Sequence, residues 1–196
     1  MSTLYKIYNM ESLSTMFRLK IAYQAENQET GEMEKVKEEI LVECANYTDA
    51  EAVLTSIVEQ YNLGKFGSVP YEIVKCKFSR HQLYVNDLIE SDDENKTLTC
   101  GLLNCSFVDG MDGLYAVDVI IFGNKAEKEK DIKDTYFIPA NDPADATHKA
   151  KEILGYGGHS KDDYAITNVK FDKATSMYFV PSSFESMKEL SLRIFG

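Results

Sequence analysis

The chain repeats one pattern of hydrophobic and polar residues twice, and a repeat restricts the possible folds more than any single motif does. The segment EEILVECANYTDAEAVL, which starts at Glu38, matches DTYFIPANDPADATHKA, which starts at Asp134, 96 residues later. YEIVKCKF at Tyr71 and YAITNVKF at Tyr164 match at a separation of 93 residues, and the short segments LYV and MYFV follow them. We therefore predict a duplicated unit whose two copies build the same elements in the same order.

Each copy begins with a strand whose apolar residues alternate with polar ones, at positions 17–23 and 115–121, which is typical of a sheet with one buried face. The connections AENQETGEMEKVK and GNKAEKEKDIK are charged, and they indicate hairpin tips that lead to a second strand. Third strands are predicted at residues 71–78 and 164–171. A short fourth element is predicted after each of them, at LYV and MYFV.

Apolar residues at helical spacing predict one helix in each copy, between its second and third strands. Asp142 followed by Pro143 starts the second helix well, and the first helix starts either at Asn46 or, through a capping box, at Thr48. A final helix is predicted near the end of the chain, where Ser183 is placed to cap it.

These elements predict the α+β class, with a duplicated β-β-α-β unit, mainly antiparallel sheets, one helix per unit and a short C-terminal helix. We expect the first unit to span residues 1–86 and the second residues 112–181. An acidic connector with an extra strand segment is expected at 87–111, and the final helix at 182–196. One helix cannot cover both faces of a sheet, so we expect the two units to pack together as one compact body.

The three glycines of GYGGHS, residues 155–160, resemble a phosphate-binding loop. Such a loop follows a strand and precedes a helix, so that the first N–H groups of the helix meet the anion. Here the predicted order is reversed, and the carbonyl groups at a helix C-terminus repel phosphate. We therefore interpret these glycines as a helix end, with Gly155 in the left-handed conformation at the position that Asn62 occupies in the first copy.

The composition favours a folded chain outside the membrane. Hydrophobic residues make up 44% of the chain, and no apolar run approaches the roughly 20 residues of a membrane span. The N-terminus lacks the basic and apolar regions of a signal peptide. We therefore expect a cytoplasmic location, where the four cysteines stay reduced.

The net charge of −11 disfavours nucleic acid as a partner, because an acidic protein repels a phosphate backbone. Much of the excess negative charge lies in the connector DLIESDDENK. This segment lacks the ligand register of an EF-hand, so we interpret it as an exposed loop. The alternative is that it imitates the charge of nucleic acid toward a basic partner.

We predict no catalytic residues, no metal site and no cofactor. The chain contains no GxSxG, HExxH, phosphate-loop or Cys-x-x-Cys motif, and none of the three histidines has a sequence partner that would orient it as a base. Cys100 and Cys105 lack a nearby histidine, which disfavours zinc. The alternative is a convergent active site that no motif reveals.

The third strands carry the main signal for binding. Tyr71, Lys75 and Lys77 are predicted to share one face of the first copy, and Tyr164 and Lys170 match them in the second. Tyrosines and lysines that alternate along a strand can stack on bases and contact phosphates. The alternative, which we favour, is that the helix packs on this face while the lysines extend their charged ends into water.

Four short motifs are shared with a known group of proteins: Lys20 to Tyr23, Gly31 to Lys35, Leu41-Val42 and Thr48 to Ala52. With them the chain resembles an uncharacterised small-protein family, a domain of unknown function of Bacteroides-type bacteria, their mobile elements and their phages. The resemblance covers residues 16–85 best and residues 113–181 weakly. It implies no activity and no catalytic residue.

Together these observations predict a non-enzymatic accessory protein of a phage or mobile element, located in the host cytoplasm if it is phage-encoded. It would bind a host protein or the machinery that processes nucleic acid. The second interpretation is a protein that sequesters a small nucleotide signal, with the ligand between the units or across a dimer. The third is a virion or assembly component. We expect a protein partner and no membrane, and we keep a homo-oligomer as an option.

Overall fold

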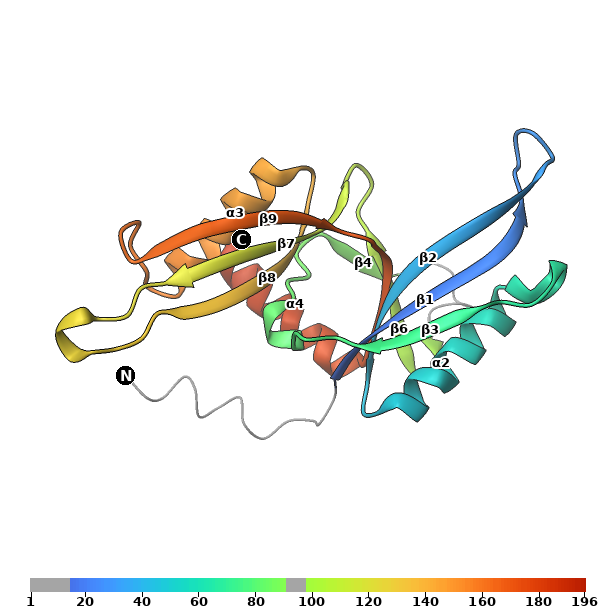
Figure 1. The fold of residues 1–196 in the computed structure, drawn as a ribbon, viewed down its shortest axis with the longest axis horizontal. Helices are drawn as coiled ribbons and strands as arrows, with labels where there is room; N and C mark the ends of the chain where they lie inside the picture. Colours follow the sequence, from blue (N-terminus) through green and yellow to red (C-terminus); the bar gives the residue numbers. More distant parts are fainter. Residues whose placement is uncertain (1–14, 91–97) are drawn as a thin grey trace.

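The computed structural model describes residues 15–90 and 98–196 (Figure 1). The first unit consists of the strands β1 (Thr15–Glu26) and β2 (Met33–Cys44), the helix α2 (Tyr47–Gln60), the short 3-10 helix η2 (Leu63–Phe66) and the strand β3 (Tyr71–Lys75). The central strand β1 pairs antiparallel with both β2 and β3.

The second unit repeats this order with β7 (Gly113–Ile121), the short 3-10 helix η4 (Lys125–Glu127), β8 (Ile132–Ala140), α3 (Pro143–Tyr156) and β9 (Tyr164–Asp172). Strand β7 pairs antiparallel with β8 and with β9, as β1 does with its neighbours. Helices α2 and α3 both contain 14 residues, and they begin and end 96 positions apart. The predicted α+β class and the duplicated β-β-α-β unit with one helix per unit are therefore confirmed.

The starts of both unit helices follow the sequence. Asn46 caps α2 by accepting a hydrogen bond from the backbone N–H of Asp49, so the start at Asn46 is confirmed over the start at Thr48. Asp142 caps α3 by accepting hydrogen bonds from two backbone N–H groups, one of them that of Asp145. The local sequence determines these ends because each cap satisfies N–H groups that have no partner inside the helix.

The fourth elements of the two units are exchanged. Strand β10 (Ala174–Phe179) follows β9 but pairs parallel with β2 of the first unit, with Met177 opposite Leu41. The segment after β3 does the reverse, since Leu83 forms a parallel bridge to Phe137 of β8. Leu41 and Phe137 are 96 positions apart and equivalent in the repeat. Each unit therefore places a segment beside the second strand of the other at an equivalent position, as a full strand on β2 and as an isolated bridge on β8.

This exchange places side chains of each unit inside the core of the other. Tyr178 of β10 packs in the cluster beneath α2, and Tyr84 packs beneath α3, where its ring lies edge-on to Tyr136 with centroids 5.8 Å apart. A third cluster lies between the units and contains Leu41 of one and Phe137 of the other. The two repeats interlock, and neither encloses a complete core with its own residues.

The segment between the units contributes further elements: η3 (Arg80–Gln82), β4 (Leu88–Glu90), β5 (Leu98–Thr99) and β6 (Leu102–Phe107). The expected extra strand segment contains β6, which pairs antiparallel with β5, β4 and β10. The larger sheet thus has the order β3-β1-β2-β10-β6-β4, and the smaller sheet β8-β7-β9. The prediction of an exposed loop is wrong for its first residues, because they form β4 and Leu88 is buried. Residues 91–97 of the predicted loop lie outside the described residues.

The C-terminal helix α4 (Pro181–Phe195) is present, but Ser183 does not cap it as the sequence predicts. Ser183 is buried inside the first turn, and its hydroxyl donates a hydrogen bond to Glu43. The other carboxylate oxygen of Glu43 accepts from the backbone N–H of Val180, at 3.1 Å. A buried side chain of β2 therefore satisfies the start of α4 in place of a local cap.

The left-handed residue at the end of α3 is Gly158, with φ +85°, whereas the sequence comparison places it at Gly155, which is helical. The N–H of Gly158 donates to the Gly155 carbonyl and that of His159 to the Leu154 carbonyl, which is the Schellman pattern. The left-handed residue after α2 is Asn62, which lies 96 positions before Gly158. A strand follows, so GYGGHS is a helix end and its order is opposite to that of a phosphate loop.

Alanine substitution is expected to have opposite effects on stability at Gly158 and at Gly155. Gly158→Ala should lower the free energy of unfolding by about 1–2 kcal/mol, because the left-handed conformation strains residues with a Cβ. Gly155→Ala should raise it by about 0.5–1 kcal/mol, because it lies within a helix and an added Cβ would meet nothing within 4 Å. Chemical denaturation of both variants measures the difference, and effects of equal sign would contradict this helix end.

Candidate functional site

The tyrosines and lysines that the sequence predicts as candidate binding residues of the two third strands lie on two different sheets. On β3, Ile73 packs against the cluster beneath α2, so Tyr71 and Lys75 share the helix-covered side of the sheet. Lys77 lies beyond the end of the strand. These three residues therefore form one local group at the edge of the larger sheet.

On β9 a β-bulge separates the two predicted residues. The register of β9 with β7 shifts by one residue at Thr167, which lies between two paired positions. Ile166 and Val169 both pack on the core beneath α3, although they are three residues apart. Tyr164 shares this covered face, whereas Lys170 lies on the opposite face of the smaller sheet.

Pairing with the central strands identifies the positions of β3 and β9 that are equivalent. Val74 pairs with Arg18 in the first unit, and Lys170 pairs with Ala116 in the second. Lys170 is therefore the counterpart of Val74, whereas the sequence comparison matches it with Lys77. The five residues do not assemble one tyrosine–lysine face.

The first of these groups lies on a free strand edge. In the described part of the chain, β3 is the terminal strand of its sheet and pairs with β1 alone. The N–H of Cys76 donates to Met16, and the Pro70 carbonyl accepts from Ala22, so even-numbered residues bond to β1. The N–H and C=O groups of residues 71, 73 and 75 consequently point away from the sheet.

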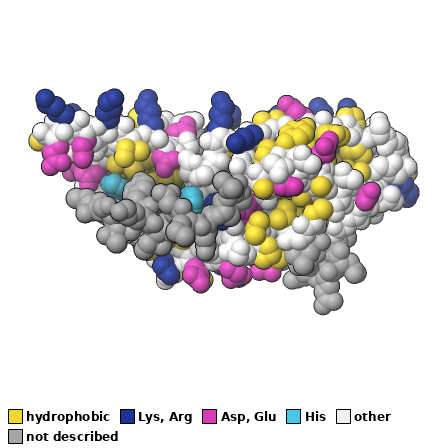
Figure 2. Space-filling view, turned by 90° about the horizontal axis from the view of Figure 1, so that it is seen from below, with side chains coloured by type: hydrophobic (Ala, Val, Ile, Leu, Met, Phe, Trp, Pro, Cys, Tyr) yellow, Lys and Arg dark blue, Asp and Glu magenta, His cyan; other side chains and the backbone are white. Residues whose placement is uncertain are grey.

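Two tyrosines flank this edge. Tyr71 is 51% exposed and Tyr47, at the start of α2, is 50% exposed, and Val74 on the other face is 37% exposed. The hydroxyl of Tyr71 donates to Glu51 at 3.0 Å, and this hydrogen bond raises the pKa of Tyr71, which therefore stays protonated at neutral pH. Figure 2 shows hydrophobic side chains gathered over the part of the molecule that holds α2 and β3 in Figure 1.

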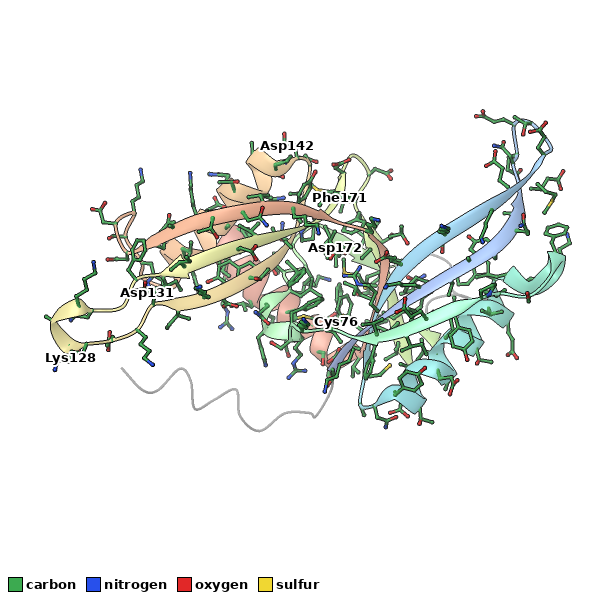
Figure 3. All side chains as sticks on the ribbon, viewed as in Figure 1. Cys76, Lys128, Asp131, Asp142, Phe171 and Asp172 are labelled. Atoms are coloured by element: carbon green, nitrogen blue, oxygen red, sulfur yellow. The ribbon has the colours of Figure 1, made fainter. Side chains whose placement is uncertain are left out.

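Charged groups meet where β9 crosses over into β10. Arg18 holds Asp172 through two hydrogen bonds of 2.7 and 2.9 Å and bonds Glu39 at 2.9 Å. Figure 3 labels Asp172 on this crossing and Cys76 just after β3. The Arg18 cluster ties the crossing strand to the first unit, and all three groups are already paired.

The thiols near this crossing and in the cores are poor nucleophiles. Burial raises the pKa of Cys76 to about 11, although the nearby Arg18 opposes this shift. Burial also raises the pKa of Cys44 and of Cys105 to about 12. A thiol reacts as its thiolate, so these three cysteines behave as packed side chains at neutral pH.

A polar cavity of about 290 Å³, the seam pocket, lies where the exchanged strand β10 joins the first unit. Its polar lining includes Tyr23, Glu38 and Tyr61 from the first unit, Asn104 from β6, and Ser176 and Tyr178 from β10. The hydroxyl of Tyr23 donates to Glu38 at 2.7 Å, and the amide of Asn104 donates to the hydroxyl of Tyr61 at 3.0 Å.

Sequence analysis did not identify any of these residues, because they come from segments far apart in the chain. The signal that was available lies in the comparison of the two repeats. Leu83 of the first copy aligns with Met177 of the second, so the residues before them, Gln82 and Ser176, are equivalent. The second copy therefore has a small serine where the first has a larger glutamine. Such a difference in size between equivalent positions indicates space in one copy.

A second cavity, of about 400 Å³, lies between α3 and α4 beside residues 85–88. Its most buried charge is Lys149, which contacts Asp87 at 2.7 Å, Asp145 at 3.0 Å and the Pro139 carbonyl at 2.9 Å. Its ammonium group therefore has three oxygen partners within the protein. We assign it to the attachment of the exchanged segment onto α3.

Comparison with known proteins identifies the family of the chain but no individual relative. The chain matches the family described as Domain of unknown function (DUF4494) over residues 15–180. No curated protein and no solved structure matches it. In the described part of the chain, no helix has the length and apolar character needed to cross a membrane.

Proposed function

The chain belongs to this DUF4494 family of unknown function, and from that premise we propose that it is a non-enzymatic protein that binds an extended segment of a partner protein at the edge of β3. The observation that carries the proposal is a strand edge whose outward N–H and C=O groups lie beside two half-exposed tyrosines. An extended segment can add to such an edge as a new strand, with the main chain supplying affinity.

The side chains around β3 define the chemistry of the segment. Alternate residues of an added strand would lie next to Tyr71, Ile73 and Lys75 on the α2 side of the sheet. An apolar or aromatic residue suits the end beside Tyr71 and Tyr47, and an acidic residue suits the end beside Lys75. Lysines on an edge also suppress indiscriminate strand pairing, so the edge favours a complementary partner.

The proposal includes a setting, that of an accessory protein of a phage or mobile element that acts on a host protein. The resemblance of the four motifs in the first unit supports this setting. The partner segment is the part that an experiment on the molecule can test directly.

Site-specific photo-crosslinking in the producing cells tests the edge. A photoreactive phenylalanine analogue at Tyr71 should give a discrete adduct with one partner protein. The same analogue at Phe171, which is 46% exposed on β9, should not give this adduct. Ile73→Pro should reduce the Tyr71 adduct at least tenfold, because proline removes an outward N–H that the added strand needs.

Ile73→Val is the matched control, because it keeps the N–H and the β-branched side chain, and its adduct should be unchanged. An adduct that is equal in the Ile73→Pro variant would overturn strand addition. An adduct with nucleic acid, or one with virion proteins alone, would replace the proposal by one of the other interpretations. An adduct of twice the chain mass would identify a second copy as the partner.

A further inference from the structure

One residue that lines the seam pocket, Asn104, has a hydrogen-bond acceptor that the fold does not use. The side-chain oxygen of Asn104 is fully buried and has no hydrogen-bond partner among the described residues, although its amide nitrogen donates to Tyr61. Buried polar groups in proteins are nearly always hydrogen-bonded. An unpartnered acceptor on a residue that lines a cavity therefore favours a ligand that brings an N–H or O–H donor.

The charge of the pocket selects among such ligands. Among the described residues that line it, Glu38 is the one with a charged side chain, and none is a lysine, an arginine or a histidine. Burial, together with the hydrogen bond to Glu38, raises the pKa of Tyr23 to about 12. The Tyr23 hydroxyl therefore remains a donor to the carboxylate at neutral pH and adds no charge. A phosphate or carboxylate ligand would meet repulsion here, whereas an ammonium group would be attracted.

The second unit has a larger side chain at the equivalent position. Gln82 occupies the place equivalent to Ser176, and its side-chain amide donates to Asp134, the counterpart of Glu38. Asp134 also accepts a hydrogen bond from the backbone N–H of Thr135, at 2.8 Å. The carboxylate of the second unit thus has an internal amide partner, while the short Ser176 leaves space beside Glu38.

From these observations we propose that the seam pocket binds the ammonium group of a small primary amine between Glu38 and the side-chain oxygen of Asn104. The aromatic rings of Tyr23, Tyr61 and Tyr178 line the same cavity and suit both the alkyl part and the positive charge of such a ligand. A cavity of about 290 Å³ admits a compact molecule, at the small end of the ligand sites found in proteins.

Three probes that each contain four carbon atoms separate the effect of charge from that of shape: n-butylammonium, n-butanol and butyrate. In titrations followed by protein NMR, n-butylammonium should give saturable shifts at the pocket residues, with an affinity at least tenfold higher than that of n-butanol or butyrate. Ser176→Gln should abolish this binding, because the side chain copies Gln82 of the second unit and fills the space beside Glu38. Glu38→Gln should weaken it at least tenfold.

Glu59→Gln is the control, because it removes the same charge from an exposed position of α2 outside the pocket, and it should bind as the unmodified protein does. Asn104→Leu should lose binding without a lower melting temperature. If Asn104 had only a structural role, the substitution would lower the melting temperature instead. Equal binding of the three probes, or full binding by Ser176→Gln, would overturn the proposal. If Ser176→Gln does not fold, Glu38→Gln and Asn104→Leu decide, and unchanged binding in both would overturn it.

Discussion

Residues 1–110 and 111–196, produced as separate chains, are expected to remain unfolded alone and to fold when mixed. The reason is the exchange of the fourth elements. The first fragment lacks Met177, Tyr178 and Phe179, each at most 2% exposed in the intact chain. Burying each of them contributes about 2 kcal/mol, so their loss removes about 6 kcal/mol. A typical domain has a total stability of about 5–15 kcal/mol.

Circular dichroism and NMR spectra of each fragment, alone and in an equimolar mixture, measure this result. The mixture should regain the dispersed spectrum of the intact chain and should sediment as a complex of one copy of each fragment. A cooperative unfolding transition in either isolated fragment would contradict the interlocked arrangement, because it would mean that one unit closes its own core.

Glu43→Ala is expected to lower the free energy of unfolding by about 3–5 kcal/mol, the cost typical of removing one partner of a buried ion pair. Glu43 is 1% exposed. It accepts hydrogen bonds from Val180 N–H and from the Ser183 hydroxyl, and its carboxylate lies 3.6 Å from the guanidinium of Arg80. The substitution removes the acceptor at the start of α4 and one of the partners of Arg80, a mostly buried cation.

Urea denaturation measures this loss, and Glu72→Ala is the matched control. Glu72 forms an exposed pair with Lys20 at 2.9 Å, and such pairs contribute about 0–1 kcal/mol. The double variant Glu43→Ala with Arg80→Ala should lose less than the sum of the two single losses, because the two residues interact. A loss for Glu43→Ala no larger than that for Glu72→Ala would contradict a structural role for the buried carboxylate.

Much of the local structure could be predicted from the sequence, because it depends on neighbouring residues. The alternation in β1 and β7 identified the buried rows of both sheets. Asn46 and Asp142 identified the helix starts, since a cap acts within one turn. The error at Gly155 came from the alignment, which matched it with Asn62 at a spacing of 93. The left-handed residues, Asn62 and Gly158, keep the spacing of 96 that relates the two helices.

The predicted shared face of Tyr164 and Lys170 is wrong for a different physical reason. One extra residue at Thr167 reverses which side chains of β9 face α3, so Tyr164 and Lys170 lie on opposite faces of the smaller sheet. The seam pocket was not predicted at all. Its lining brings together Tyr23, Asn104 and Tyr178, which no periodic pattern connects.

The sequence by itself determined the repeated elements, their order, their helix starts and the α+β class, because these follow from local hydrogen bonding and hydrophobic periodicity. Only the tertiary structure decided that β10 and the segment at Leu83 change places between the units. A strand pattern specifies which face is buried but does not specify the strand that pairs at its edge. That choice created the interlocked cores, the buried Glu43 contact with α4 and the seam pocket.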